Sequence, residues 1–133
     1  MRMAMAAGLA LAVMAGGHAL AEGPVGLWKT AEGDDGRFLH VRIAPCVEDA
    51  GLLCGTVDGA FGGADAATIG RALIWDMAPD GPQRWDGGKV WAADEDEVYS
   101  AKMAMAGADT LTLSGCILGG LICRGQDWTR VVE

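Results

Sequence analysis

The stretch VYSAKMAMA-GAD-TLTLSGC, residues 98–116, decides the fold class. Every second residue from Tyr99 to Met105 is Tyr, Ala or Met, and polar Ser100 and Lys102 fall between them. After the turn Gly107-Ala108-Asp109, leucine alternates with threonine. A period of two is typical of a strand with one buried face, so this stretch predicts an antiparallel hairpin.

The same pattern of short strands between turn signals continues in both directions from this hairpin, and no long helical pattern is present. Residues 58–70 are expected to form a loop, with room for a short helical turn. Strands at this spacing predict an all-β fold, a small antiparallel up-and-down β-barrel of about eight strands. Such a barrel is filled by side chains or holds one small ligand. The expected strands are Val25–Thr30, Phe38–Ala44, Leu52–Val57, Ala72–Met77, Arg84–Trp91, Val98–Ala106, Thr110–Cys116 and Leu121–Val132.

The N-terminus has the order of a cleavable secretory signal. Arg2 is followed by an uncharged run to Gly17, and then by the small-x-small triplet Ala19-Leu20-Ala21. A membrane anchor is the alternative, but this run is shorter than the roughly 20 apolar residues that cross a bilayer. We therefore predict a signal peptide over 1–21, a single β-barrel domain over 22–133 without a membrane span, and a location in the periplasm or outside the cell.

The charge balance is acidic. The chain carries 18 acidic and 10 basic residues, and its formal net charge is −8. Residues 1–21 hold one of the basic residues and none of the acidic ones, so their removal makes the charge −9. An acidic surface repels phosphate backbones, and nucleic acid is therefore a poor candidate partner.

Four cysteines, an even number, suggest disulfide bonds in an exported chain. Four cysteines allow three pairings, and we favour Cys46–Cys54 and Cys116–Cys123, because each pair flanks a short turn-like segment. A zinc site is the alternative. Its paired ligands are usually separated by two to four residues, and the gaps here are longer.

One block has the residue types of a ligand site: Trp85, Asp86, Gly87, Gly88 and Lys89. It offers an indole for stacking, charged groups for orientation and glycines for close approach. A bend in a strand with a packed tryptophan is the alternative interpretation. Tyr99 and Lys102 on the next strand are further candidates, but alternation puts them on opposite faces, so only one can join a given cluster.

Several segments in this order resemble a family of bacterial secreted proteins, domain of unknown function 2147. The most specific are WDGGKV at 85–90 and QDWTRV at 126–131; the others are GLWKT at 26–30, RIAPC at 42–46 and YSAKM at 99–103. The resemblance spans nearly all of residues 22–133 and implies a class without a reaction.

A second resemblance is to lipocalin-like barrels. These place Gly-x-Trp on the first strand and an Arg of the last strand over that Trp, positions that Gly26-Leu27-Trp28 and Arg130 fill. We expect structural roles for Trp28, Trp128 and Arg130.

No catalytic constellation stands out. His18 lies in the predicted signal, which leaves His40 alone, and the acidic run 94–97 lacks the spacing of a calcium loop. We expect no metal, no cofactor and no enzyme activity. The leading hypothesis is a non-enzymatic binding module that takes a small apolar or amphipathic ligand inside the barrel. The alternatives are a cell-envelope module that interacts with another protein or has a structural role, and, third, a hydrolase.

Overall fold

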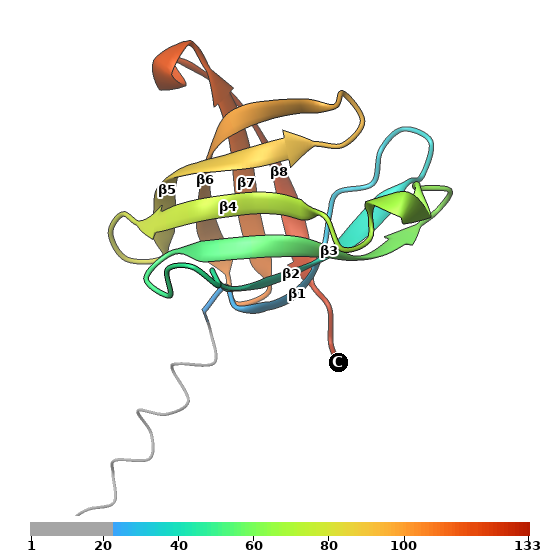
Figure 1. Cartoon of the computed structure of the whole chain (residues 1–133), viewed down its shortest axis with the longest axis horizontal. Coiled ribbons are helices and arrows are strands. Elements are labelled where there is room, and N and C mark those ends of the chain that lie inside the picture. The colour runs from blue at the N-terminus through green and yellow to red at the C-terminus, as the bar shows by residue number, and fades with distance from the viewer. Residues whose placement is uncertain (1–22) are drawn as a thin grey trace, which may run out of the picture.

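The computed structural model describes residues 23–133, and the predicted signal peptide lies outside the described residues. Eight antiparallel strands follow one another around a closed barrel, and β1 pairs with β8 to complete it (Figure 1). The predicted all-β up-and-down barrel is therefore confirmed. The strands are β1 Gly26–Lys29, β2 Phe38–Pro45, β3 Leu53–Phe61, β4 Ala72–Pro79, β5 Arg84–Ala92, β6 Glu97–Gly107, β7 Thr110–Ile117 and β8 Ile122–Arg130.

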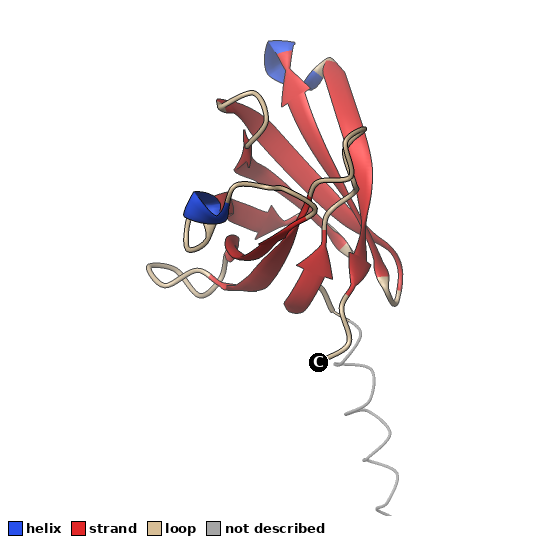
Figure 2. Cartoon of the chain, turned by 90° about the vertical axis from the view of Figure 1, so that its right-hand side faces the viewer, coloured by secondary structure: helices blue, strands red, loops and turns tan. Residues whose placement is uncertain are grey.

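Within residues 23–133, helix is confined to two 3-10 turns, η2 (Ala66–Thr68) and η3 (Leu118–Gly120), which Figure 2 shows in blue at the rim of the strands. In the described part of the chain, no helix is long and apolar enough to cross a membrane. The largest difference from the expected elements is at β3, which extends to Phe61 and takes in four residues of the expected loop.

The alternation seen in the sequence separates the inside of the barrel from its outside. In the hairpin of β6 and β7, Ala101 and Met103 are buried opposite Gly115 and Leu113, and Lys102 is exposed. Residues paired directly across strands share a face, so buried residues line up around the barrel. The fully buried side chains are Trp28, Val41, Ile43, Val57, Ile74, Met77, Leu111 and Trp128.

Register shifts in β4 and β5 shape one side of the barrel. The pairing of β3 with β4 shifts register twice between Leu53 and Thr56, and the pairing of β5 with β6 shifts between Trp85 and Gly88. Such shifts are β-bulges, which bend a strand and turn its side chains in new directions. The candidate site lies on this irregular side.

Candidate functional site

The interior of the barrel is packed. Two tryptophans, Trp28 and Trp128, occupy it together with aliphatic and methionine side chains that are almost completely buried. This packing does not agree with the expected position of a ligand inside the barrel, because eight strands enclose only enough room for side chains or for a ligand, and side chains take it here. We therefore looked for a candidate site on the outer face of the barrel.

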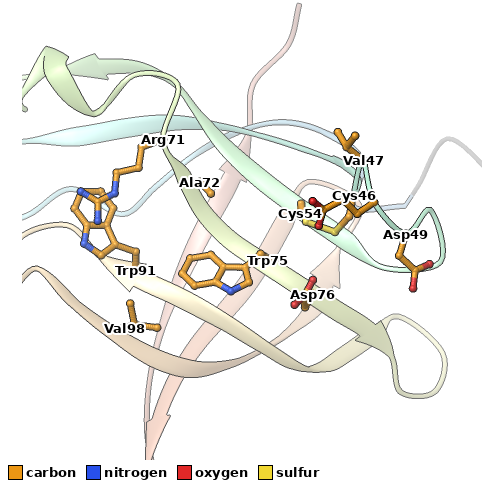
Figure 3. Close-up of a pocket in the computed structure, with 11 residues that line it drawn as sticks. Cys46, Val47, Asp49, Cys54, Arg71, Ala72, Trp75, Asp76, Trp91 and Val98 are labelled. Carbon is orange, nitrogen blue, oxygen red and sulfur yellow. A yellow bond between two sulfur atoms is a disulfide. The ribbon is translucent and has the colours of Figure 1, made fainter.

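A groove of about 660 Å³ opens on the outer face, across β4 and its neighbours (Figure 3). Trp75 lies in the middle of the groove, between Arg71 and Trp91 at one end and the Cys46–Cys54 disulfide at the other. Val98 of β6 borders one side. The groove thus has an aromatic centre, an apolar flank and polar groups at both ends.

Strand geometry explains why Trp75 and Trp91 face outward. Ile74 and Val90 oppose one another and are buried, so the residues that follow them point to the opposite face. Trp75 is half-buried, whereas Trp91 is only 6% exposed, although both line the groove. Asp76, which follows Trp75, has a φ of 58°, a left-handed conformation in the irregular part of β4.

Trp91 is covered by charged groups. The Arg71 guanidinium lies 3.4 Å from the centre of its ring, and the indole Nε1 donates to the Asp96 carboxylate at 2.9 Å. The same carboxylate lies 3.8 Å from Arg71. The Arg71 guanidinium at this end of the groove therefore already contacts the Trp91 ring and the Asp96 carboxylate.

The disulfide end of the groove is acidic. Glu48, Asp49 and Asp76 line it, and all three are exposed. The predicted Cys46–Cys54 pair is confirmed, and Asp76 lies close to its sulfur atoms. Sulfurs bonded to one another are not the thiolates that bind metals, so this trio is not a metal centre.

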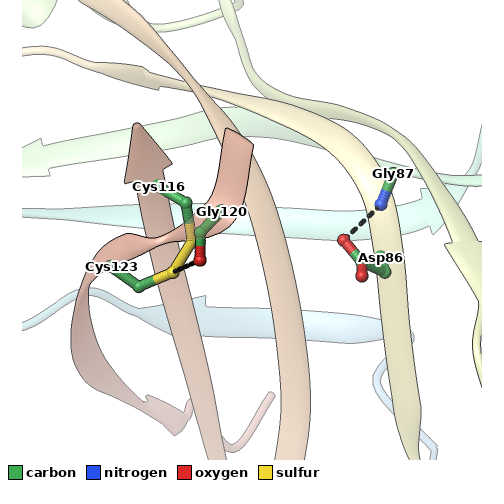
Figure 4. The surroundings of a disulfide bond; sticks show 5 residues. All are labelled: Asp86, Gly87, Cys116, Gly120 and Cys123. Atoms are coloured by element: carbon green, nitrogen blue, oxygen red, sulfur yellow. Dashed lines mark hydrogen bonds between the residues drawn. A yellow bond between two sulfur atoms is a disulfide. The ribbon is translucent and has the colours of Figure 1, made fainter. Parts of the chain in front are cut away.

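The two glycines of the predicted Trp85–Lys89 block have backbone roles. Gly87 has a φ of 81°, and a Cβ atom there would meet no atom within 4 Å. Its N–H donates to the Asp86 carboxylate at 2.7 Å (Figure 4). At Gly88, a Cβ atom would lie 2.3 Å from the Met77 sulfur and 2.4 Å from the Trp75 carbonyl oxygen. Gly88 therefore lets β4 approach β5 closely, behind the centre of the groove.

The rest of the predicted ligand set does not form one cluster. Trp85 is half-buried opposite Met103, on the face that points to the core, and Asp86 lines a separate shallow hollow of about 340 Å³ at the β4–β5 turn. Lys89 is exposed and opposes Trp75 on the outer face. Of the predicted residues, Lys89 is thus the one that the strand pairing brings beside the groove.

Tyr99 and Lys102 lie on opposite faces of β6, as their spacing requires. Tyr99 opposes Val90, and its hydroxyl donates to the Glu95 carboxylate. That hydrogen bond, followed by burial and the negative charges nearby, raises the pKa of Tyr99 above its usual value. Lys102 is exposed and opposes Ser114 on the outer face.

The residues expected to be structural lie where the barrel closes. Trp28 opposes Arg130, whose guanidinium lies 4.5 Å from the centre of the indole ring. The Trp28 Nε1 donates to the Pro24 carbonyl, and the Trp128 Nε1 donates to the Gln126 side chain. Each buried indole nitrogen therefore has a partner, as burial of a polar group requires.

The sequence did not predict an aromatic cluster that lies on β1, β2 and β3. The His40 ring lies 4.4 Å from that of Phe61 and 6.0 Å from that of Phe38, and Lys29 lies over Phe38. Its members come from three adjacent strands, and the extension of β3 to Phe61 completes it. His40 is thus packed among aromatic rings.

Comparison with known proteins agrees with this architecture. The family described as uncharacterized proteins conserved in bacteria, DUF2147, matches residues 26–130, which span all eight strands. The chain belongs to the DUF2147 family. A search of the curated proteins found no match.

The DUF2147 barrel of this chain is also similar to a solved structure, the protein HP1028 from the human pathogen Helicobacter pylori, which belongs to the lipocalin family. The two share 14% sequence identity over 82% of this chain and 83% of the other, with a TM-score of 0.66. The expected lipocalin-like fold is therefore confirmed. At this identity the likeness concerns the fold.

Proposed function

We propose that this DUF2147 protein is an exported, non-enzymatic binding module whose outer groove takes a small amphipathic ligand with a cationic end. The observation that carries the proposal is the groove itself, with Trp75 at its centre and carboxylates at one end, on a barrel whose interior is packed. Ligand sites are typically concave, mostly apolar and marked by a few polar groups that fix orientation.

The apolar part of the ligand would lie along the centre of the groove. The half-buried Trp75 offers a flat aromatic surface, and Val98 beside it is 54% exposed. A flat apolar body stacked on an indole gains both buried area and aromatic packing. The groove volume of about 660 Å³ suits a small molecule.

The charges argue for a cation at the disulfide end. Glu48, Asp49 and Asp76 line that end, while the single basic residue of the groove, Arg71, lies at the other end against Trp91 and Asp96. The residues that line the groove therefore carry a net negative charge, and Lys89, which opposes Trp75 beside the groove, offsets part of it. A cationic group placed near the carboxylates and the Trp75 ring gains from both.

Export is supported by two observations of different kinds. The N-terminal sequence has the order of a secretory signal. Two disulfide bonds and no free cysteine in the described residues are typical of proteins from oxidising compartments.

A fluorescence titration with two flat dyes of opposite charge tests the proposal. Acridine orange, a cation, is expected to bind more tightly than 1-anilinonaphthalene-8-sulfonate, an anion, and added salt should weaken its binding. Trp75→Ala should raise the Kd for acridine orange by about tenfold, because the stacking surface is lost. Asp76→Asn should also raise it, and asparagine tolerates the left-handed backbone at this position.

Trp85→Ala is the matched control. Trp85 is likewise a half-buried tryptophan packed against the core, but it does not line the groove. Circular dichroism establishes that each variant is folded. Equal affinity of the wild type and Trp75→Ala for the cationic dye would rule the groove out as the site.

A further inference from the structure

The tip of the β7–β8 hairpin exposes a group of aliphatic side chains. Ile117 is 45% exposed, Leu118 66%, Leu121 84% and Ile122 54%. Four large aliphatic side chains within six residues form an apolar patch on an otherwise acidic protein, and such patches mark sites of interaction.

The hairpin presents these side chains on a fixed support. Ile117 opposes Ile122 as the last pair of the ladder, and the η3 turn joins the strands. Directly behind this pair, the predicted Cys116–Cys123 disulfide is confirmed and links the strands covalently (Figure 4). In Figure 1 the tip is the orange-red turn that projects from the barrel at the top of the view. Its shape is therefore preorganised for contact, which lowers the entropic cost of binding.

Charge is distributed around the tip in a particular way. No residue from Thr110 to Cys123 is charged, and the next residue, Arg124, is an exposed cation. Arg124 makes no ion pair among residues 23–133. An uncharged apolar tip with a free guanidinium directly behind it is complementary to a phospholipid surface, where hydrocarbon lies beneath a layer of phosphate.

We propose that the β7–β8 tip inserts shallowly into the interface of a phospholipid bilayer and holds the barrel at the membrane surface. A pocket in a protein partner fits the tip less well. Its six residues, Ile117 to Ile122, carry no side-chain hydrogen-bonding group, whereas specific protein sites use such groups for orientation. A lipid interface requires none.

A second copy of the chain is also a poor occupant. Four partly exposed side chains fall well short of the roughly 800 Å² per partner that a stable interface buries. Insertion into lipid has a natural limit as well. The η3 turn is irregular backbone, and such backbone does not enter the hydrocarbon region when it faces lipid. Arg124 then lies at the depth of the phosphates.

Co-sedimentation with vesicles of phosphatidylcholine tests this placement. The protein is produced with its own N-terminal segment and exported, and intact mass establishes the N-terminus, which must be the same in all variants. The wild type is expected to sediment with the vesicles. Leu118→Ser combined with Leu121→Ser should lower the partition coefficient by about tenfold or more, because the two most exposed side chains of the tip lose their apolar surface.

Val132→Ser is the matched control, because Val132 is an aliphatic residue that is 93% exposed and lies outside both the hairpin tip and the groove. It should sediment as the wild type does. Adding phosphatidylglycerol to the vesicles at low salt should weaken binding, since residues 22–133 carry 9 basic and 18 acidic residues, a net charge of −9, and salt should remove that difference. Equal sedimentation of the wild type and the double leucine variant, or none of the wild type, would overturn the proposal. Dye binding in the groove is unaffected by either result.

Discussion

Arg130 of β8 closes the barrel over Trp28 of β1. Its guanidinium lies 4.5 Å from the centre of the indole ring and donates to the carbonyl oxygens of Gly23, Val25 and Ala108. One side chain thus joins the lead-in to the first strand, the turn before the last-but-one strand and the ring of the first strand.

Arg130→Lys should therefore destabilise the fold even though it keeps the charge. An ammonium has no planar fork and cannot donate to three carbonyl groups in this arrangement. We expect the free energy of unfolding to fall by about 1.5–3 kcal/mol, measured by urea denaturation with tryptophan fluorescence. Arg71→Lys, at the exposed cation over Trp91, is the control and should cost less than about 1 kcal/mol. Equal losses would show that stacking on a ring, and not the carbonyl contacts, is what matters.

Gly88→Ala should be one of the most damaging small substitutions in the chain. Its Cβ would collide with the sulfur of Met77 and with the Trp75 carbonyl, and backbone cannot yield as a side chain does. We expect a loss of about 3 kcal/mol or more, together with a change in the fluorescence of the groove. Gly87→Ala meets no atom and has only its positive φ to strain, so it should cost roughly 1–2 kcal/mol. Thermal unfolding of the two variants side by side provides the comparison.

Removing either disulfide should cost a similar amount of stability. The sequence separations are 8 and 7 residues, and the chain-entropy relation gives about 2–3 kcal/mol for loops of this length. The functional consequences should differ. The double change Cys46→Ser with Cys54→Ser alters one end of the groove and should weaken dye binding, whereas Cys116→Ser with Cys123→Ser should leave it intact. A reversed pattern would contradict the assignment of the groove.

Tyr99 should ionise at higher pH than an ordinary tyrosine. Its phenol donates to Glu95, and ionisation would place an anion beside that carboxylate and near Glu97. Since Tyr99 is the only tyrosine of the chain, ultraviolet titration near 295 nm reports on it alone. Glu95→Gln should move the pKa back toward the usual value. Because the folded-state pKa is raised, this contact stabilises the fold below the unfolded-state pKa, and the contribution is lost as the pH rises through the folded-state value.

The barrel could be predicted from the sequence because alternation is a local property. The pattern at Tyr99, Ala101 and Met103 puts these residues on one face, and the structure buries Ala101 and Met103 there and half-buries Tyr99. The short Cys-to-Cys spacings predict both disulfides. The resemblance to lipocalin-like barrels also paired Trp28 of the first strand with Arg130 of the last, and these two residues oppose one another in the structure.

The groove could not be predicted in this way. The groove depends on register shifts in β4, where Asp76 has a left-handed backbone conformation, and the sequence carries no signal of these shifts. It also depends on Trp75 lying beside residues that are far away in sequence. The Trp85–Lys89 block attracted attention for its glycines, and those glycines serve the backbone: one turns the strand, and the other makes room for β4. Alternation gives the face of a residue, but a bulge determines which residues of that face come together.

The pairing of β1 with β8 also has a consequence for how the chain is made. β1 is the first of the eight strands to be synthesised and β8 the last, yet they are neighbours, paired at Trp28 with Arg130 and at Lys29 with Thr129. The ring therefore cannot close until synthesis is complete, and until then β1 has only β2 to hold it. A chain that stops before Trp128 would lose a core tryptophan together with the partner of β1, and would expose two strand edges open to pairing with other chains.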